Sequence, residues 1–453
     1  MEMLNSIFTS INGVLWDFAL LVLLCGTGIW FTIRLKFVQV RNFKRGLKQM
    51  LGGMRKKGEG ADKNGISSFQ ALTTAIAGQV GTGNLAGAAT AIACGGAGAI
   101  FWMWLSAFFG MATIYAEALM AQKYKTTKDG EVTGGPVYYI RAAFQGTFGK
   151  VLATIFSVLI IFALGFMGNA VQANSISDAF ATAFGVSPVI VGVIIAVLAF
   201  SIFAGGIKRI AEVTEKLVPF MAVFYLIGGL IVILCNLGAV PGVFRDIFVG
   251  AFAPDAVAGG VIGVTVQQSI RYGVARGLFS NEAGMGSTPH AHAIAKVNHP
   301  GEQGCVAIIS VFIDTFCVLT MTTLVILTSG VVKSDGSLTG TALTQAAFST
   351  IFGKFGNIFI AICMLFFAFS TIIGWYFFGE TNVKYLFGQR AVKIYAVLVC
   401  IMIVIGSGLK VDLVWTMADT FNGLMVIPNL IALLALTGSV IKLSGEFDQI
   451  KKK

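Results

Sequence analysis

The stretch GQVGTGNLAG, from Gly78 to Gly87, decides the fold because it interrupts an apolar segment that extends over about residues 68–94. Its ten residues include four glycines, two side-chain amides and one threonine. A glycine in a helix interior costs about 1 kcal/mol relative to alanine, and an unpaired backbone group in lipid costs considerably more. A membrane tolerates such a weak point only where it is buried in protein or lines a wet cavity. The stretch therefore predicts a binding site at membrane depth.

The composition is that of a polytopic membrane protein. The 453 residues are 56% hydrophobic and 12% charged, with a mean hydropathy of +0.83, which a soluble domain of this length does not reach. The net charge of +11 comes from basic residues in short segments between apolar ones. Membrane orientation explains these residues better than nucleic-acid binding does. The seven scattered cysteines include no CxxC pair and indicate small core residues.

Eleven segments are long and apolar enough to cross a bilayer. The first covers residues 14–33, and in the basic run after it Phe43, Leu47 and Met50 recur at helical spacing. This run predicts an amphipathic helix on the inner membrane surface. Ten core helices follow, at about 68–94, 97–121, 151–173, 188–207, 214–236, 257–285, 304–330, 355–379, 391–409 and 414–441.

Lysine and arginine concentrate in alternate connections between these spans. The poorer set of connections holds only Arg245, Lys333, Lys354 and Lys410. The asymmetry predicts an integral protein of the cell membrane with its amino terminus outside and its carboxyl terminus in the cytoplasm. Two connections predict structure of their own: an inner helix within Gly134–Gly146, which offers a proline for its first turn, and an outer lid over Gly336–Gly353.

A second interrupted span lies five core helices after the first, in VTVQQSIRYGVARGLFSNEAGMG from Val264 to Gly286. A displacement of five helices places the two halves in opposite orientations. Glycine-interrupted spans in corresponding places of inverted halves indicate a secondary transporter with its site at the midplane. The predicted organisation is all-α, with a leading helix and an amphipathic helix (1–63), two inverted halves (64–236 and 237–441) and a basic tail (442–453).

The first interruption predicts a place for a carboxylate. Small residues there let backbone amides face an anion at the amino end of a half-helix, and side-chain donors lie beside them. The predicted substrate-binding residues are Gln79, Thr82, Gly83 and Asn84. Gly83 and Gly87 also form a GxxxG pair, for which close helix packing is an equally good explanation.

The third core helix and Trp375 predict the walls of the pocket. Gly165 and Gly168 would let that helix approach the site, with Phe166 and Asn169 facing it. Simple helix packing explains these residues as well, and Trp375 either closes a small pocket or only packs.

Adjacent hydroxyls in the eighth core helix predict a cation site. Hard oxygen ligands and the carboxyl end of a half-helix suit a small cation. The predicted sodium ligands are the carbonyls of Ala77, Val80 and Phe367 and the hydroxyls of Ser370 and Thr371. The alternative is that the hydroxyls bond the carbonyl one turn back.

Charged residues within the spans are candidates for gates; they are Glu117, Arg271, Arg276, Asp314 and Asp419. His290, His292 and His299 share one connection, HAHAIAKVNH, without further ligands at metal-site spacing. No nucleophile and base are arranged for catalysis at membrane depth. The sequence therefore predicts neither an enzyme nor a cofactor beyond the coupling ion.

The run GGAGAIFWMWLSAFFG, from Gly95 to Gly110, resembles the signature of the alanine or glycine:cation symporter family, and so do GTGNLAGAATAIA before it and GVARGLFSNEAGMGS after it. The resemblance extends from about Gly65 to the end of the tenth core helix. It implies the leucine-transporter fold with one extra leading helix. It also implies sodium-coupled uptake of small neutral amino acids, alanine first and glycine as a second candidate.

Two motifs of the fold fall on residues already singled out. Gly81–Asn84 resembles its carboxylate-binding turn, and Phe367–Thr371 resembles its second sodium site. The sixth helix fits less well, because the unwound segment of this fold has no arginine that resembles Arg271. Its break is predicted near Gln268–Gly273, which adds Gln268 and Gly273 to the predicted substrate-binding residues. Two alternatives stay open. One is a proton-coupled symporter of the same fold, in which a lysine of the fifth core helix takes the place of the sodium ion; Lys216 is the candidate, but it lies near the inner end of that helix. The other is an ion channel. The oligomeric state is not predicted.

Overall fold

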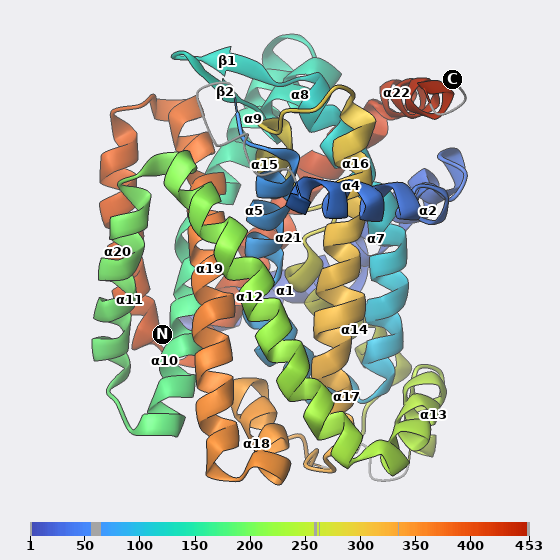
Figure 1. Ribbon diagram of the computed structural model, residues 1–453, viewed down its shortest axis with the longest axis vertical. Coiled ribbons are helices and arrows are strands. Elements are labelled where there is room, and N and C mark those ends of the chain that lie inside the picture. The colour runs from blue at the N-terminus through green and yellow to red at the C-terminus, as the bar shows by residue number, and fades with distance from the viewer. Residues whose placement is uncertain (1, 56–64, 258–260, 262, 334, 451–453) are drawn as a thin grey trace.

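The structure is a computed structural model that describes all residues except 1, 56–64, 258–260, 262, 334 and 451–453 (Figure 1). The predicted domain boundary at residue 63 and the end of the basic tail lie outside the described residues. In that part of the chain, seven helices are long and apolar enough to cross a membrane. Two shorter apolar helices pack side by side, α11 (Pro188–Phe203) and α20 (Ala391–Ser407). The two interrupted spans come in addition, and the total of eleven remains a prediction.

The leading segment forms one long helix followed by a surface helix. The amphipathic helix predicted there is confirmed as α4, which lies across the upper end of the bundle in Figure 1. Its Gly46 packs against α16, whereas Leu47 and Leu51 are exposed. The elements of this part are α1 (Glu2–Val14), η1 (Leu15–Ala19), α2 (Leu20–Arg34), α3 (Val38–Arg41) and α4 (Phe43–Arg55).

The first core helix is interrupted as predicted. A capping box of Ser67 and Gln70 starts α5, and the helix ends before Val80, whose backbone is extended (φ −83°, ψ 92°). A Cβ at Gly81 would lie 2.3 Å from Thr371 Oγ1, so only glycine fits there. The elements are α5 (Ser68–Gln79), the π-helical η2 (Gly83–Gly87) and α6 (Ala88–Gly95).

The sixth core helix is interrupted later than predicted. Helix α14 is continuous from Val266 to Asn281, and Gln268 forms a capping box with Thr265 at its start. The chain reverses at Glu282, which has a positive φ of 56°, and Gly284 and Gly286 follow with φ of +91° and +79°. The placement of the break near Gln268–Gly273 is therefore wrong. Gly273 instead allows α14 to pack closely against α7, because a Cβ at this position would lie 2.4 Å from the Ala99 carbonyl oxygen of α7.

The rest of the first half consists of long helices and a small hairpin. A helix beginning at Pro136 is confirmed as α8. The elements are α7 (Gly98–Lys123), β1 (Thr126–Lys128), β2 (Glu131–Thr133), α8 (Pro136–Ala143), α9 (Gly146–Ile160), the π-helical η3 (Ile161–Gly168), α10 (Asn169–Phe184) and α12 (Gly206–Cys235).

The second half adds the remaining elements. These are η4 (Leu237–Ala239), α13 (Val240–Gly250), η5 (Pro254–Ala256), α14 (Val266–Asn281), α15 (Pro289–Ala293), α16 (Pro300–Val311), η6 (Phe312–Leu319), α17 (Thr320–Thr328), α18 (Gly340–Phe352), α19 (Lys354–Phe387), α21 (Val411–Ala435) and α22 (Thr437–Ile450). Helix α18 falls within the predicted outer lid and touches the interrupted helix, since Thr344 Oγ1 donates to the Leu85 carbonyl at 3.0 Å.

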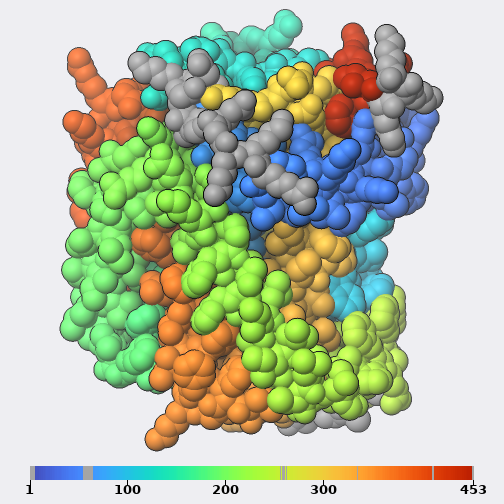
Figure 2. Space-filling model, viewed as in Figure 1, coloured from blue at the N-terminus to red at the C-terminus, as the bar shows by residue number. Residues whose placement is uncertain are grey.

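The bundle has two ends and an apolar flank. The end with α4, α8, the hairpin and α22 is called the α4 face, and the end with α13 and α18 is called the α18 face (Figure 1). On the flank shown in Figure 2, the green helices α11 and α12 cover a large area. Their exposed side chains include Val197, Phe220 and Ile227, as expected of helices that face lipid.

Candidate substrate and cation site

The interruption of the first core helix is held by a side chain of its own. Asn84 Oδ1 accepts a hydrogen bond from the Gly81 N–H at 2.9 Å, and Asn84 Nδ2 donates to Asp314 Oδ1 at 2.7 Å. Ser280 Oγ, from the end of α14, donates to the same Asp314 carboxylate at 2.9 Å. Asp314 therefore joins the breaks of both interrupted helices to η6. The amide of Asn84 shapes the turn with both of its polar atoms.

Three of the predicted substrate-binding residues carry buried polar atoms that have no partner among the described residues. They are Gln79 Oε1, Thr82 Oγ1 and Asn169 Oδ1, on side chains that are at most 1% exposed. A buried polar group without a partner is costly, and such groups occur in native proteins where a ligand or water completes them. Gly83 has the packing role left open above, because a Cβ there would lie 3.0 Å from Ser280 Cα.

Trp375 lies against the third core helix, a position that fits both alternatives given above, closing a small pocket and simple packing. A Cβ at Gly168 would lie 2.4 Å from the Trp375 ring, and this glycine ends the π-helical segment η3, a feature frequent at functional sites. Trp375 also packs edge-on against Phe279 of α14. Phe166 instead packs on Phe162 and on Tyr395 of α20, with ring centroids 5.6 and 5.8 Å away.

The predicted sodium ligands from the two helices come together. Thr371 Oγ1 lies 3.3 Å from the Val80 carbonyl oxygen and 3.1 Å from that of Phe367, and Ser370 Oγ lies 2.8 Å from the latter. Gly374, one turn further along α19, packs against the Ala77–Gly78 peptide. The hydroxyls of Ser370 and Thr371 bond the Phe367 carbonyl one turn back, as the packing alternative predicts. Thr371 also contacts the Val80 carbonyl of the interrupted helix. The donor set consists of hard oxygens, which suits a small cation.

The residues around the turn Val80–Asn84, together with Ser370, Thr371 and Trp375, are called the cluster below. Two predicted residues lie away from it. Gln268 is exposed at the start of α14, and Gly273 packs on α7 between that start and the break. The sequence reasoning also missed two residues that the fold brings in. Gln172 Oε1 accepts from the Thr82 N–H at 3.1 Å, and Glu282, fully buried in the sixth-helix break, accepts from Trp375 Nε1. A carboxylate in the glycine-rich run NEAGMG is the signal that could have identified Glu282.

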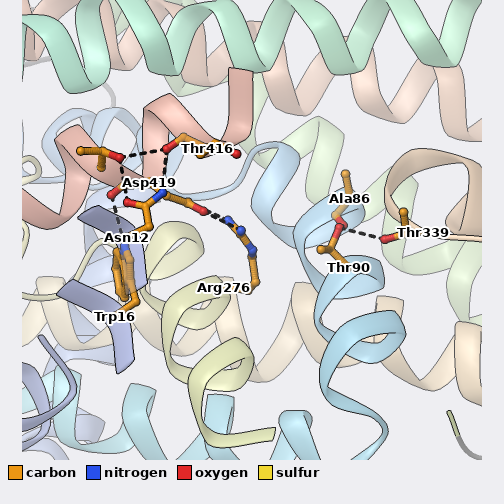
Figure 3. A network of polar contacts seen from close by, with 9 residues as sticks. Asn12, Trp16, Ala86, Thr90, Arg276, Thr339, Thr416 and Asp419 are labelled. Atoms are coloured by element: carbon orange, nitrogen blue, oxygen red, sulfur yellow. Dashed lines mark hydrogen bonds and ion pairs between the residues drawn. The ribbon is translucent and has the colours of Figure 1, made fainter. Parts of the chain in front are cut away.

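An ion pair closes the cluster toward the α18 face. Arg276 of α14 donates to both oxygens of Asp419 on α21, at 2.8 and 2.7 Å (Figure 3). Arg276 also lies over the ring of Trp415. Trp415 packs on Phe279, which packs on Trp375. The stacked rings and the Arg276–Asp419 ion pair therefore lie between the cluster and a cavity that Arg271 and Arg276 help to line.

The leading helix is bound to the same place. Trp16 Nε1 donates to the Asp419 carbonyl at 3.3 Å, and Asn12 Nδ2 donates to the Thr416 carbonyl at 2.8 Å (Figure 3). Arg271 pairs with Asp17 at 2.9 Å. The extra helix thus contacts both helices that carry the ion pair.

The connection after the sixth-helix break closes the cluster toward the α4 face. Glu117 of α7 accepts from the N–H groups of Gly284 and Gly286, at 3.0 and 2.9 Å. Gln122 Nε2 bonds the carbonyls of His292 and Ala295. Among the described residues, His, Cys, Asp and Glu form no group of three that could hold a metal ion.

Comparisons with known proteins agree with this architecture. The family model for the sodium:alanine symporter family matches residues 1–453. The chain belongs to this family. It is 43% identical over 451 residues to the sodium/alanine symporter AgcS of Methanococcus maripaludis, covering 99% of the chain and 98% of that protein. It is 42% identical over 452 residues to the probable sodium/glutamine symporter GlnT of Bacillus subtilis, covering 100% of the chain and 92% of the relative.

Solved structures show the same fold at low sequence identity. MhsT in complex with L-phenylalanine matches with a TM-score of 0.57 at 14% identity, over 86% of the chain and 99% of MhsT. A mutant of the Eremococcus coleocola manganese transporter matches with a TM-score of 0.53 at 15% identity, over 81% of the chain and 77% of that protein. The leucine-transporter fold is therefore confirmed. The chain is an integral membrane symporter for amino acids and not an enzyme.

Proposed function

We propose that the chain couples sodium entry to the uptake of alanine, and of glycine, by alternating access. The observation that carries the proposal is the position of one turn, Val80–Asn84. The Val80 carbonyl meets Thr371 on one side, and the unpaired side-chain atoms of Gln79 and Thr82 lie at the same turn. One short segment thus offers oxygens for a cation and partners for an amino acid.

Binding of each ligand would favour the shape that the other needs. A sodium ion held by Ala77, Val80, Phe367, Ser370 and Thr371 would fix the interrupted helix against α19. The turn would then present Gln79, Thr82 and backbone amides to the substrate carboxylate. Coupling of this kind is reciprocal, so each ligand raises the affinity of the other by the same factor.

Substrate size is proposed to be limited by Trp375. The ring lies against Gly168 and Phe279, and Asn169 brings an unpaired oxygen to the same helix junction. A rigid ring in this place favours side chains of one hydrogen or one methyl group. A relative of this chain is named as a probable sodium/glutamine symporter, so the substrate preference proposed here rests on the residues around Trp375 in this chain.

The two sealed ends would open in turn. We assign the α4 face to the cytoplasm because it carries the basic connections. Opening toward the α18 face would separate Arg276 from Asp419, and opening toward the α4 face would displace the connection that contains α15. Lys216 of α12 is exposed, which favours a sodium ion over a lysine side chain as the cation at Thr371.

Uptake of labelled alanine into proteoliposomes tests the proposal. A sodium gradient should drive accumulation, and a proton gradient of equal size without sodium should not. Glycine should compete with alanine, and glutamine should compete less well. Accumulation driven by the proton gradient alone would overturn sodium coupling, and passage of ions much faster than a carrier cycle would indicate a channel.

A further inference from the structure

Glu282 is a buried carboxylate at the point where the sixth core helix breaks. It is 0% exposed and has a positive φ of 56°, so the backbone itself turns at this residue. Its Oε1 accepts from Trp375 Nε1, and its Oε2 lies 2.5 Å from Ser287 Oγ. The carboxylate therefore connects the substrate wall at Trp375 with the connection that leads to α15.

No basic side chain pairs with Glu282 in the described part of the chain. The charged groups that act on Glu282 through space are two further carboxylates, Asp314 and Glu117, and α5 contains no titratable residue. Two basic groups on the neighbouring helices α14 and α19 already have acidic partners. Arg276 pairs with Asp419, and Lys384 pairs with Glu380 at 2.7 Å.

His290 does not supply the missing charge. Its Nδ1 lies 2.7 Å from the Ser287 carbonyl, which can only accept, and its Nε2 lies 2.9 Å from Asn382 Nδ2, which can only donate. The ring is thus neutral with its proton on Nδ1. Burial lowers the pKa of His290 to about 4, which keeps the ring neutral.

An ionised carboxylate without a cation is strongly disfavoured in such a place. A proton on Oε2 removes the charge and keeps every contact. The acid then donates to Ser287 Oγ across the same 2.5 Å, while Oε1 still accepts from Trp375. Both oxygens are already engaged in this way, which leaves the carboxyl group satisfied without a substrate ammonium group.

We propose that Glu282 is a proton-binding site of the transport cycle, occupied while the cluster is sealed and emptied when the chain opens toward the α4 face. The path out is short. Ser287 lies three residues before His290, which lines a cavity on the α4 face together with Thr381 and Lys384. Movement of this connection would admit water to the carboxyl group, which then releases its proton.

The proton moves in the same direction as alanine, from the α18 face to the α4 face. The proton joins Oε2 from the α18 side as substrate and sodium bind, and it leaves to water on the α4 side, which restores the carboxylate. One proton therefore moves with each alanine. The inference rests on the proposed function, because it presupposes sodium-driven alanine uptake.

Proteoliposomes that contain a pH-sensitive dye test the inference. Under a sodium gradient and with the membrane potential clamped, alanine uptake by the unaltered protein should acidify the lumen. Glu282→Gln, which keeps both hydrogen bonds but carries no proton, should take up alanine without acidification and with little dependence on pH. Glu380→Gln is the matched control, since it alters a buried glutamate that already has a lysine partner, and it should acidify the lumen like the unaltered protein.

Several results would overturn the inference. Uptake by the unaltered protein without acidification would do so, and so would acidification that persists in Glu282→Gln. A large loss of alanine affinity in Glu282→Gln at every pH, without proton movement in the unaltered protein, would assign the carboxylate to the substrate ammonium group instead. If Glu282→Gln does not fold, Ser287→Ala should shift the pH dependence of uptake, and an unshifted profile contradicts the proposal. Absence of sodium-driven uptake in the unaltered protein would contradict the proposed function itself.

Discussion

Arg276 and Asp419 are joined by two hydrogen bonds, at 2.8 and 2.7 Å, that tie the sixth core helix to the tenth. Their side chains are only 10% and 16% exposed. The pair therefore differs from the Arg271–Asp17 pair beside it, whose side chains are 32% and 39% exposed. Loss of one partner should matter much more in the first pair than in the second.

Asp419→Asn should destabilise the protein by about 3 kcal/mol, because it leaves a buried guanidinium without its counter-charge. Asp17→Asn should cost less than about 1 kcal/mol, as expected of an exposed pair. Thermal unfolding in detergent measures both, with uptake assays on the same preparations. Equal shifts of the two variants would show that the buried pair has no special role in closing the α18 face.

Trp16→Phe should weaken the same closure, because it removes the N–H that donates to the Asp419 carbonyl while keeping an aromatic ring. Combined with Asp419→Asn, its effect on the apparent affinity for alanine should be smaller than the product of the single effects, since neighbours in one network are not additive. Trp30→Phe is the control, because Trp30 belongs to the same leading helix but bonds Thr437. If the effects of Trp16→Phe and Asp419→Asn multiply, the leading helix does not contribute to closure by the Arg276–Asp419 pair.

Gly168→Ala should abolish transport, because the added Cβ would lie 2.4 Å from the ring of Trp375 and overpacking of this kind costs about 1–3 kcal/mol. The combination with Trp375→Leu should restore part of the activity and admit larger substrates. Gly26→Ala, at a position with open space, should leave uptake unchanged. If Gly168→Ala transports alanine normally, Trp375 does not form the wall of the pocket.

Thr371→Ala should weaken activation by sodium about tenfold or more, since a bond to a charged group contributes about 1.5–3 kcal/mol. Thr371→Ser keeps the hydroxyl and should stay close to the unaltered protein. Thr328→Ala is a matched control, because this buried hydroxyl also bonds the carbonyl one turn back, at 2.7 Å, but lies in α17. The sodium concentration that gives half-maximal uptake is the quantity to compare, and an unchanged value for Thr371→Ala would exclude the cation site.

Much of the fold followed from local chemistry. The clustered glycines around Gly81 weaken a helix wherever it is placed, so the first interruption could be predicted without neighbours. The alternation of basic and apolar residues around Phe43 likewise required an amphipathic helix. The hydroxyls of Ser370 and Thr371 could be paired with Val80 because an interrupted helix must expose carbonyls at its carboxyl end.

The sixth helix shows where such reasoning ends. Its sequence contains several glycines and polar residues, and each could mark a break in isolation. Contacts with α7 decided among them, because Gly273 is needed for close approach, whereas Gly284 and Gly286 can give their N–H groups to Glu117.

The sequence by itself determined that a helix breaks at Val80–Asn84 and that oxygens of α19 are available to it, because glycine content and hydroxyl position act locally. Only the tertiary structure decided which charges meet. Arg276 and Asp419 are 143 residues apart, and Glu282 became isolated only when α7, α14 and α19 packed around it. Pairing and burial depend on distances between helices, which spacing along one chain does not specify.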